Sequence, residues 1–99
     1  MSFVTARPEM LTAAAGSLSR IGSAMASNNA AAEGPTTGVA PPAADQVSQL
    51  VGTHFAAHGL AYQTIALMAN QIHEAFVNAL STGATSYTIT EAANVAAAG

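Results

Sequence analysis

One stretch of the chain, residues 41–80, constrains the fold more than any other. It reads PPAADQVSQLVGTHFAAHGLAYQTIALMANQIHEAFVNAL and contains no proline after its first two residues. Its apolar side chains recur at steps of three and four residues, which is the spacing of one helical face and not the alternation of a strand. A helix over about residues 42–80 would form a rod of roughly 55–60 Å. The sequence therefore predicts an all-α protein organised around one unusually long helix.

A shorter helix is predicted before this stretch, over about residues 8–32. Pro8 suits the first helical position because its missing N–H would be unpaired there, and Glu9 faces the positive end of the helix dipole. Gly34 and Pro35 should end this helix, since glycine can adopt a left-handed cap and proline cannot continue the turn. The connection to the long helix is short, so we expect the two helices to fold back as an antiparallel hairpin.

The C-terminal residues, 85–99, are predicted to form a tail outside the hairpin. Gly83 should end the long helix, so that the hairpin occupies residues 1–84. The run from Thr88 to Glu91 matches a capping box, which favours a further short helix. We expect that helix to fray, because little apolar surface is left to dock it.

The composition argues against several classes of function. Two arginines, no lysine and a net charge of −3 cannot assemble a phosphate-binding patch, so nucleic acid is not an expected partner. The absence of cysteine removes disulfides, thiolate metal ligands and a thiol nucleophile. No glycine-rich phosphate loop, triad-like grouping or pair of carboxylates on one helix face occurs. We therefore expect no enzyme, no cofactor and no small-molecule substrate.

His54 and His58 form the pattern closest to a metal site. They are four residues apart on one helical face, a spacing at which two imidazoles can share a metal ion. They also lie in the middle of the apolar face, and no cysteine or nearby carboxylate completes a set of ligands. We predict no metal, and we interpret both histidines as packed side chains whose protonation would loosen an association.

The hairpin is not expected to be stable alone. The apolar face of the long helix is broader than one alanine-rich helix can cover, and only 7% of the residues are charged. A domain with so thin a core needs a disulfide, a metal or association, of which association is the route left here. Gly52 and Gly59, on one side of the long helix, are either tolerated glycines or a groove for a partner helix.

A membrane-surface protein is the alternative interpretation. No window of about 18 residues is apolar enough to span a bilayer, and the N-terminus lacks the features of a secretory signal peptide. An amphipathic helical protein lying on a membrane would usually carry Lys and Arg on its polar face, where this chain has Gln, Asn, Ser and Thr. Membrane contact is therefore an alternative and not our prediction, and these signals alone indicate a cytosolic protein.

The whole chain resembles the mycobacterial PE family. The opening MSFVTARPEML contains the Pro8-Glu9 dipeptide that names the family, and PTTGVAPPAADQVS resembles its inter-helix segment, with Gln46 where many members have glutamate. HEAFVNAL and SYTITEAANVAAAG resemble the ends of the second helix and of the domain. The resemblance implies a helical hairpin that pairs with a PPE-family protein into a four-helix bundle. It also implies export of that heterodimer by a type VII secretion system.

The resemblance further implies a secretion signal and a location. The family's signal is a tyrosine followed four residues later by an acidic residue, here Tyr87 and Glu91. A protein exported in this way has no secretory signal peptide, so the expected location becomes the cell surface or the medium. We expect the core shared with the PPE partner to contain Leu11, Leu18, Ile21, Met25, Leu50, Phe55, Ile65, Met68, Ile72 and Phe76.

Overall fold

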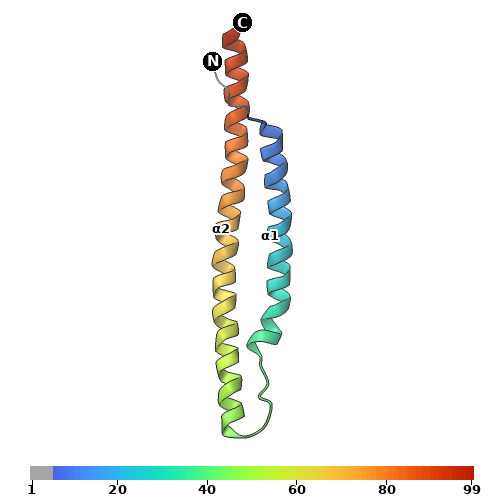
Figure 1. The fold of residues 1–99 in the computed structure, drawn as a ribbon, viewed down its shortest axis with the longest axis vertical. Helices are drawn as coiled ribbons and strands as arrows, with labels where there is room; N and C mark the ends of the chain where they lie inside the picture. Colours follow the sequence, from blue (N-terminus) through green and yellow to red (C-terminus); the bar gives the residue numbers. More distant parts are fainter. Residues whose placement is uncertain (1–5) are drawn as a thin grey trace. The chain divides into compact units, whose positions relative to one another are not determined.

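Two helices account for most of the chain (Figure 1). The computed structural model describes residues 6–99, in which helix α1 runs over Pro8–Thr37 and helix α2 over Gln46–Ala98. No strand occurs within this described range. The all-α class and the helical hairpin predicted from the sequence are therefore confirmed, and completion of a bundle by a partner chain stays a prediction.

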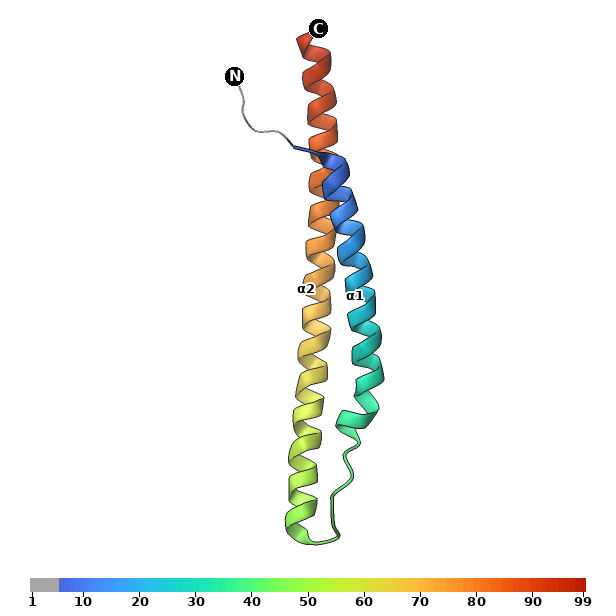
Figure 2. The same ribbon diagram turned by 45° about the vertical axis from the view of Figure 1, so that its right-hand side comes forward.

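The chain divides into two compact units, each made of one segment from each helix. The terminal unit comprises Met1–Ile21, described from residue 6 onwards, together with His73–Gly99. The loop unit comprises Gly22–Ile72 and contains the connection between the helices. Within each unit the two helical segments run antiparallel (Figure 2). They pack against each other along one line of contact, which we call the seam.

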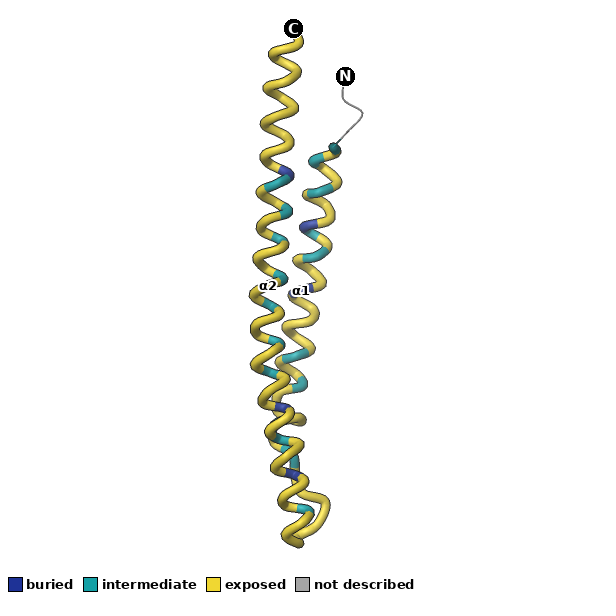
Figure 3. The backbone as a smooth tube through the Cα atoms, turned by 60° about the vertical axis from the view of Figure 1, so that its left-hand side comes forward, coloured by how far each residue is buried: buried dark blue, intermediate teal, exposed yellow. Residues whose placement is uncertain are grey.

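Small and polar side chains form the seam of the loop unit, and a few leucine and valine side chains join them in the terminal unit. The buried and half-buried positions of α2 recur at alternating steps of four and three residues, which is the spacing of a helix packed against one neighbour (Figure 3). In the described chain the buried apolar residues are two alanines, Ala15 and Ala84. Such a seam buries little apolar area and contributes little hydrophobic free energy. Its α2 positions are Gly52, Ala56, Gly59, Gln63, Ala66 and Asn70 in the loop unit, and His73, Val77, Leu80 and Ala84 in the terminal unit.

Glycines allow close backbone approach in the loop unit. A Cβ placed on Gly59 would lie 2.7 Å from the carbonyl carbon of Thr36 and closer still to its oxygen. A Cβ on Gly52 would lie 3.4 Å from the Cα of Pro41. Gly59 therefore accommodates this chain's own backbone, and Gly52 faces Pro41 of the same chain at an ordinary contact distance. The hypothesis that they form a groove for a partner helix is wrong, because that space is already filled.

Helix α1 continues past the predicted end at Ala32 to Thr37, and two threonine hydroxyls bond to carbonyl oxygens in its last turns. Thr36 Oγ1 donates a hydrogen bond to the carbonyl oxygen of Ala32 at 2.6 Å. Thr37 Oγ1 donates to the carbonyl oxygen of Glu33 at 2.7 Å. Pro35, which was expected to end the helix, lies inside it. Both are bonds from a threonine side chain to the carbonyl oxygen one turn earlier in the same helix.

Helix α2 begins at Gln46 and not at residue 42, because Asp45 caps it. The Asp45 carboxylate accepts a hydrogen bond from the backbone N–H of Ser48 at 2.9 Å and another from the Ser48 hydroxyl at 2.8 Å. The backbone bond is the main cause that holds the pKa of Asp45 below its ordinary value, and the hydroxyl bond acts in the same direction. The prolines expected to open the helix instead lie in the connection.

The predicted break at Gly83 is wrong, because α2 continues through it to Ala98. Thr88 Oγ1 donates to the carbonyl oxygen of Ala84 at 3.0 Å, so the hydroxyl expected to cap a new helix instead bonds within the existing one. Glycine inside a helix costs only about 1 kcal/mol relative to alanine, which neighbouring turns can offset. The functional division between hairpin and tail at residue 84 stays a prediction.

We expect Gly59→Ala to destabilise the fold by about 1–3 kcal/mol, because the added methyl group would push the Thr36 backbone away. Gly83→Ala is the matched control, since nothing lies within 4 Å of a Cβ at that position. The control should be as stable as the wild type or slightly more stable. Thermal unfolding followed by far-ultraviolet circular dichroism measures both. An unchanged melting temperature for Gly59→Ala would contradict the close approach.

The cap at Asp45 predicts a pH-dependent stability. Its pKa is lowered in the folded protein from the ordinary value of 3.8, so the carboxylate stabilises the fold above pH 3.8. That contribution is lost as the pH falls through the lower folded-state pKa. We therefore expect Asp45→Ala to melt a few degrees below the wild type at neutral pH, with the difference shrinking in acid. A difference that does not change with pH would rule out the carboxylate as its cause.

Candidate partner interface

Helix α2 exposes a series of large apolar side chains on one side of the seam. Ile65 is 63% exposed and Ile72 is 68% exposed, values that a monomer core would not show. At about 100° per residue these positions lie away from the seam, so α1 does not cover them. We call the set the apolar stripe; its members on α2 are Val47, Leu50, Val51, Phe55, Tyr62, Ile65, Met68 and Ile72 in the loop unit and Phe76 in the terminal unit.

Helix α1 adds exposed apolar side chains to this side. In the loop unit, Met25 is 54% exposed, and its helical position places it on the same side of the seam as Ile65. In the terminal unit, Ile21 is exposed and by the same argument lies on the side of Phe76. Each unit therefore has an uncovered apolar side to which both of its helical segments contribute.

The residues predicted to form a shared core fall into two groups. Leu11 and Leu18 are half-buried in the seam of the terminal unit, where they pack within this chain. The structure thus distinguishes an internal seam from an exposed stripe, which the sequence analysis had merged. Binding of a partner by the exposed group stays a prediction; that group contains Ile21, Met25, Leu50, Phe55, Ile65, Met68, Ile72 and Phe76.

Side-chain hydrogen bonds tie the helices together across the seam. In the loop unit, the Tyr62 hydroxyl donates to Asn29 Oδ1 at 2.7 Å, and Gln63 Nε2 donates to the backbone oxygen of Asn29 at 3.2 Å. In the terminal unit, His73 Nε2 lies 2.6 Å from the backbone oxygen of Leu18. No role was predicted for these polar residues from the sequence. The place of Gln63 and His73 in the alternating four-and-three spacing with glycine and alanine is the signal that would have found those two.

His54 and His58 are exposed on the side of the apolar stripe. Their predicted packing is therefore not made by this chain and would need a partner. No group of three or more His, Cys, Asp or Glu side chains suited to a metal occurs in the described residues. His58 instead borders an open groove whose other lining residues are Phe55, Gly59 and Tyr62 of α2, with Pro35, Thr36 and Val39.

The residues of the family motif and of the predicted secretion signal are both helical. Pro8 and Glu9 open the first turn of α1. Tyr87 and Glu91 are exposed and lie four residues apart on α2, so they are neighbours on one helical face. Neither helix, over the range described, has a stretch that is long and apolar enough to cross a membrane.

Comparison with known proteins identifies relatives over the whole chain. The sequence model described as the PE family matches residues 4–94. The chain is 56% identical to the PE family protein PE13 of Mycobacterium tuberculosis over 98 residues, which cover 99% of each chain. It is 49% identical to PE8 of the same organism over 98 residues, which are 99% of this chain and 36% of PE8. It is 50% identical to the M. tuberculosis protein PE_PGRS34 over 97 residues, 98% of this chain and 19% of that one. The chain thus spans nearly all of PE13 and a minor part of the other two.

Proposed function

Since the chain belongs to the PE family, we propose that it is a non-enzymatic interaction module that pairs with a PPE-family protein. The apolar stripe, with Ile21 and Met25, would form one half of a shared four-helix core. The observation that carries this proposal is the distribution of side chains. Most of the large apolar ones are exposed, whereas the seam of the loop unit holds glycine, alanine and amides and that of the terminal unit has few large apolar side chains.

The energetics of burial support a partner on the stripe. Burying one isoleucine or phenylalanine side chain contributes about 1.5–3 kcal/mol, and several such side chains lie together here. A standard interface buries about 800 Å² on each partner, which a helix-long stripe can supply. The low charge of the chain also lowers the cost of removing its surface from water. Association would therefore supply the core that the seam lacks.

Export by a type VII secretion system is the second part of the proposal, with the cell surface or the medium as the destination. We assign the signal to Tyr87 and Glu91 on α2. Both side chains are exposed, so the export machinery could contact them while the stripe is covered. In this proposal the C-terminal part of α2 is recognised as a helix.

The alternative is an amphipathic helical protein acting at a membrane surface, which would use the same exposed stripe. The two functions predict different requirements for folding. The partner proposal predicts that helical content rises when the PPE protein is added and changes little with anionic vesicles. Far-ultraviolet circular dichroism under these two conditions distinguishes them, and helix induced by vesicles alone would favour the membrane.

We expect Ile65→Asp to prevent pairing. The substitution would place an unpaired charge in the shared core, at a cost of about 3–5 kcal/mol, so the dissociation constant should rise at least about 100-fold. Leu60→Asp is the matched control, because Leu60 is similarly exposed but projects from the other side of the seam. Co-expression with the PPE protein and size-exclusion chromatography measure the complex. Co-elution of Ile65→Asp at the wild-type level would refute the assignment of the stripe.

Tyr87→Ala should leave the heterodimer intact and abolish its export, since the substituted side chain lies outside the stripe. The neighbouring Ser86→Ala, which changes another exposed position, serves as the control and should be exported normally. Immunoblots of the culture medium, the cell surface and the cell lysate measure the distribution. If Tyr87→Ala reaches the medium at the wild-type level, Tyr87 is not part of the signal.

A further inference from the structure

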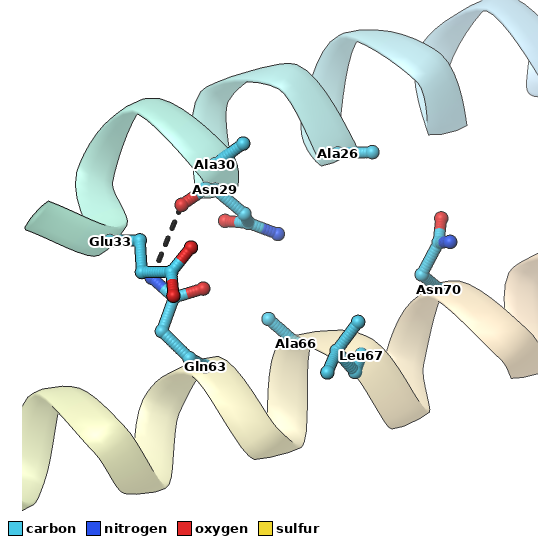
Figure 4. A pocket seen from close by; sticks show the side chains of 8 residues that line it. All are labelled: Ala26, Asn29, Ala30, Glu33, Gln63, Ala66, Leu67 and Asn70. Carbon is cyan, nitrogen blue, oxygen red and sulfur yellow. Dashed lines mark hydrogen bonds between the residues drawn. The ribbon is translucent and has the colours of Figure 1, made fainter.

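The loop unit has a second surface on the side of the seam opposite the apolar stripe. There α1 and α2 border a groove of about 190 Å³, which we call the amide groove (Figure 4). Its polar lining consists of Asn29 and Glu33 from α1 and of Gln63 and Asn70 from α2. Its apolar lining is Leu67 and alanines of both helices. This groove has no role in the pairing proposed above.

Helical geometry separates the amide groove from the stripe. Ile65, Ala66 and Leu67 are consecutive on α2, so they project at steps of about 100°. Ala66 lies in the seam, Ile65 in the stripe and Leu67, 67% exposed, in the groove. A protein that covers the stripe therefore leaves the groove open.

The polar groups of the amide groove offer more acceptors than donors. Gln63 Nε2 already donates a hydrogen bond to the backbone oxygen of Asn29. Asn29 Oδ1 already accepts one from the Tyr62 hydroxyl. Gln63 Oε1, the Glu33 carboxylate and the Asn70 amide make no hydrogen bond to another described residue. The Asn29 and Asn70 amides still offer N–H donors, whereas the Glu33 carboxylate and Gln63 Oε1 can only accept and need a donor.

The charge of the groove is negative and has no counterpart in its own unit. Glu33 is the one ionisable side chain in the lining. The two arginines of the chain, Arg7 and Arg20, belong to the terminal unit. A cationic group from another molecule would therefore complement the groove.

The volume and the lining of the amide groove favour one kind of cationic group, the guanidinium of an arginine. Pockets that hold a whole small molecule measure about 300–1,000 Å³, whereas this groove has room for one long side chain. A guanidinium presents five N–H donors in a planar fork, which pairs with a carboxylate through two parallel bonds and leaves donors for amide oxygens. The aliphatic stem of an arginine would lie against Leu67 and the alanines.

We propose that the amide groove is a docking site for an arginine side chain of a second protein, which binds the face opposite the apolar stripe. Glu33 pairs with the guanidinium, Gln63 Oε1 accepts one of its remaining N–H groups, and Leu67 contacts its stem. This inference does not depend on the identity of the protein that covers the stripe.

The test is a titration with N-acetyl-arginine amide of the full-length protein, under conditions in which far-ultraviolet circular dichroism shows that both helices are formed. It is followed by the side-chain amide NMR signals of Asn29, Gln63 and Asn70. We expect saturable shifts of these signals. The Glu33→Gln variant should bind the probe about five- to tenfold more weakly, because a charge-assisted pair becomes a neutral one. N-acetyl-citrulline amide, which has nearly the same shape without the charge, should bind the wild type more weakly by a similar factor.

Glu74→Gln is the matched control, since Glu74 is an exposed carboxylate of the terminal unit outside the groove. It should bind N-acetyl-arginine amide like the wild type. The proposal is overturned if the three amide signals do not shift, if citrulline binds as well as arginine, or if Glu33→Gln binds like Glu74→Gln. Each of these results is independent of whether a PPE protein pairs with the stripe.

Discussion

The seam between the two helices is too poor in apolar side chains to serve as the core of a stable domain. Its buried apolar residues are alanines, and at Gly59 the helices approach so closely that no side chain fits. Close backbone contact gains dispersion energy, but it removes little apolar surface from water. Most of the large apolar side chains consequently lie outside the seam, and the greater number of them are exposed on one side of it.

A seam of small side chains also specifies its alignment weakly, because one alanine or glycine layer resembles the next. Directional hydrogen bonds supply what packing does not. Asn29 accepts from Tyr62 and Gln63 in the loop unit, and His73 contacts the Leu18 carbonyl in the terminal unit. A shift of one helix along the other would separate these pairs. The polar residues of the seam thus fix which turns of the two helices face each other.

The sequence was sufficient to predict the helices and their antiparallel pairing, because apolar periodicity and a short connection depend on local features. It was not sufficient to predict their ends. Gly34, Pro35 and Gly83 are common terminators, yet all three lie inside helices, because a local terminating signal is weak against the turns on either side of it. The residues of the seam were not predicted from the sequence for another reason. A ranking by hydrophobicity places Ile65 above Ala66 as a core residue. That ranking fails in a chain whose largest apolar side chains are mostly exposed.

The three consecutive residues Ile65, Ala66 and Leu67 show how one helix can meet three different surroundings. A helical step of about 100° directs the first to the stripe, the second to the seam and the third to the amide groove. The stripe and the groove do not overlap, yet Asn29 connects them, since it bonds Tyr62 of the stripe and Gln63 of the groove. A partner that immobilised Tyr62 would also restrict Asn29, and a ligand in the groove would then lose less conformational entropy on binding. Any coupling between the two sides would therefore pass through shared hydrogen bonds and would need no movement of the helices.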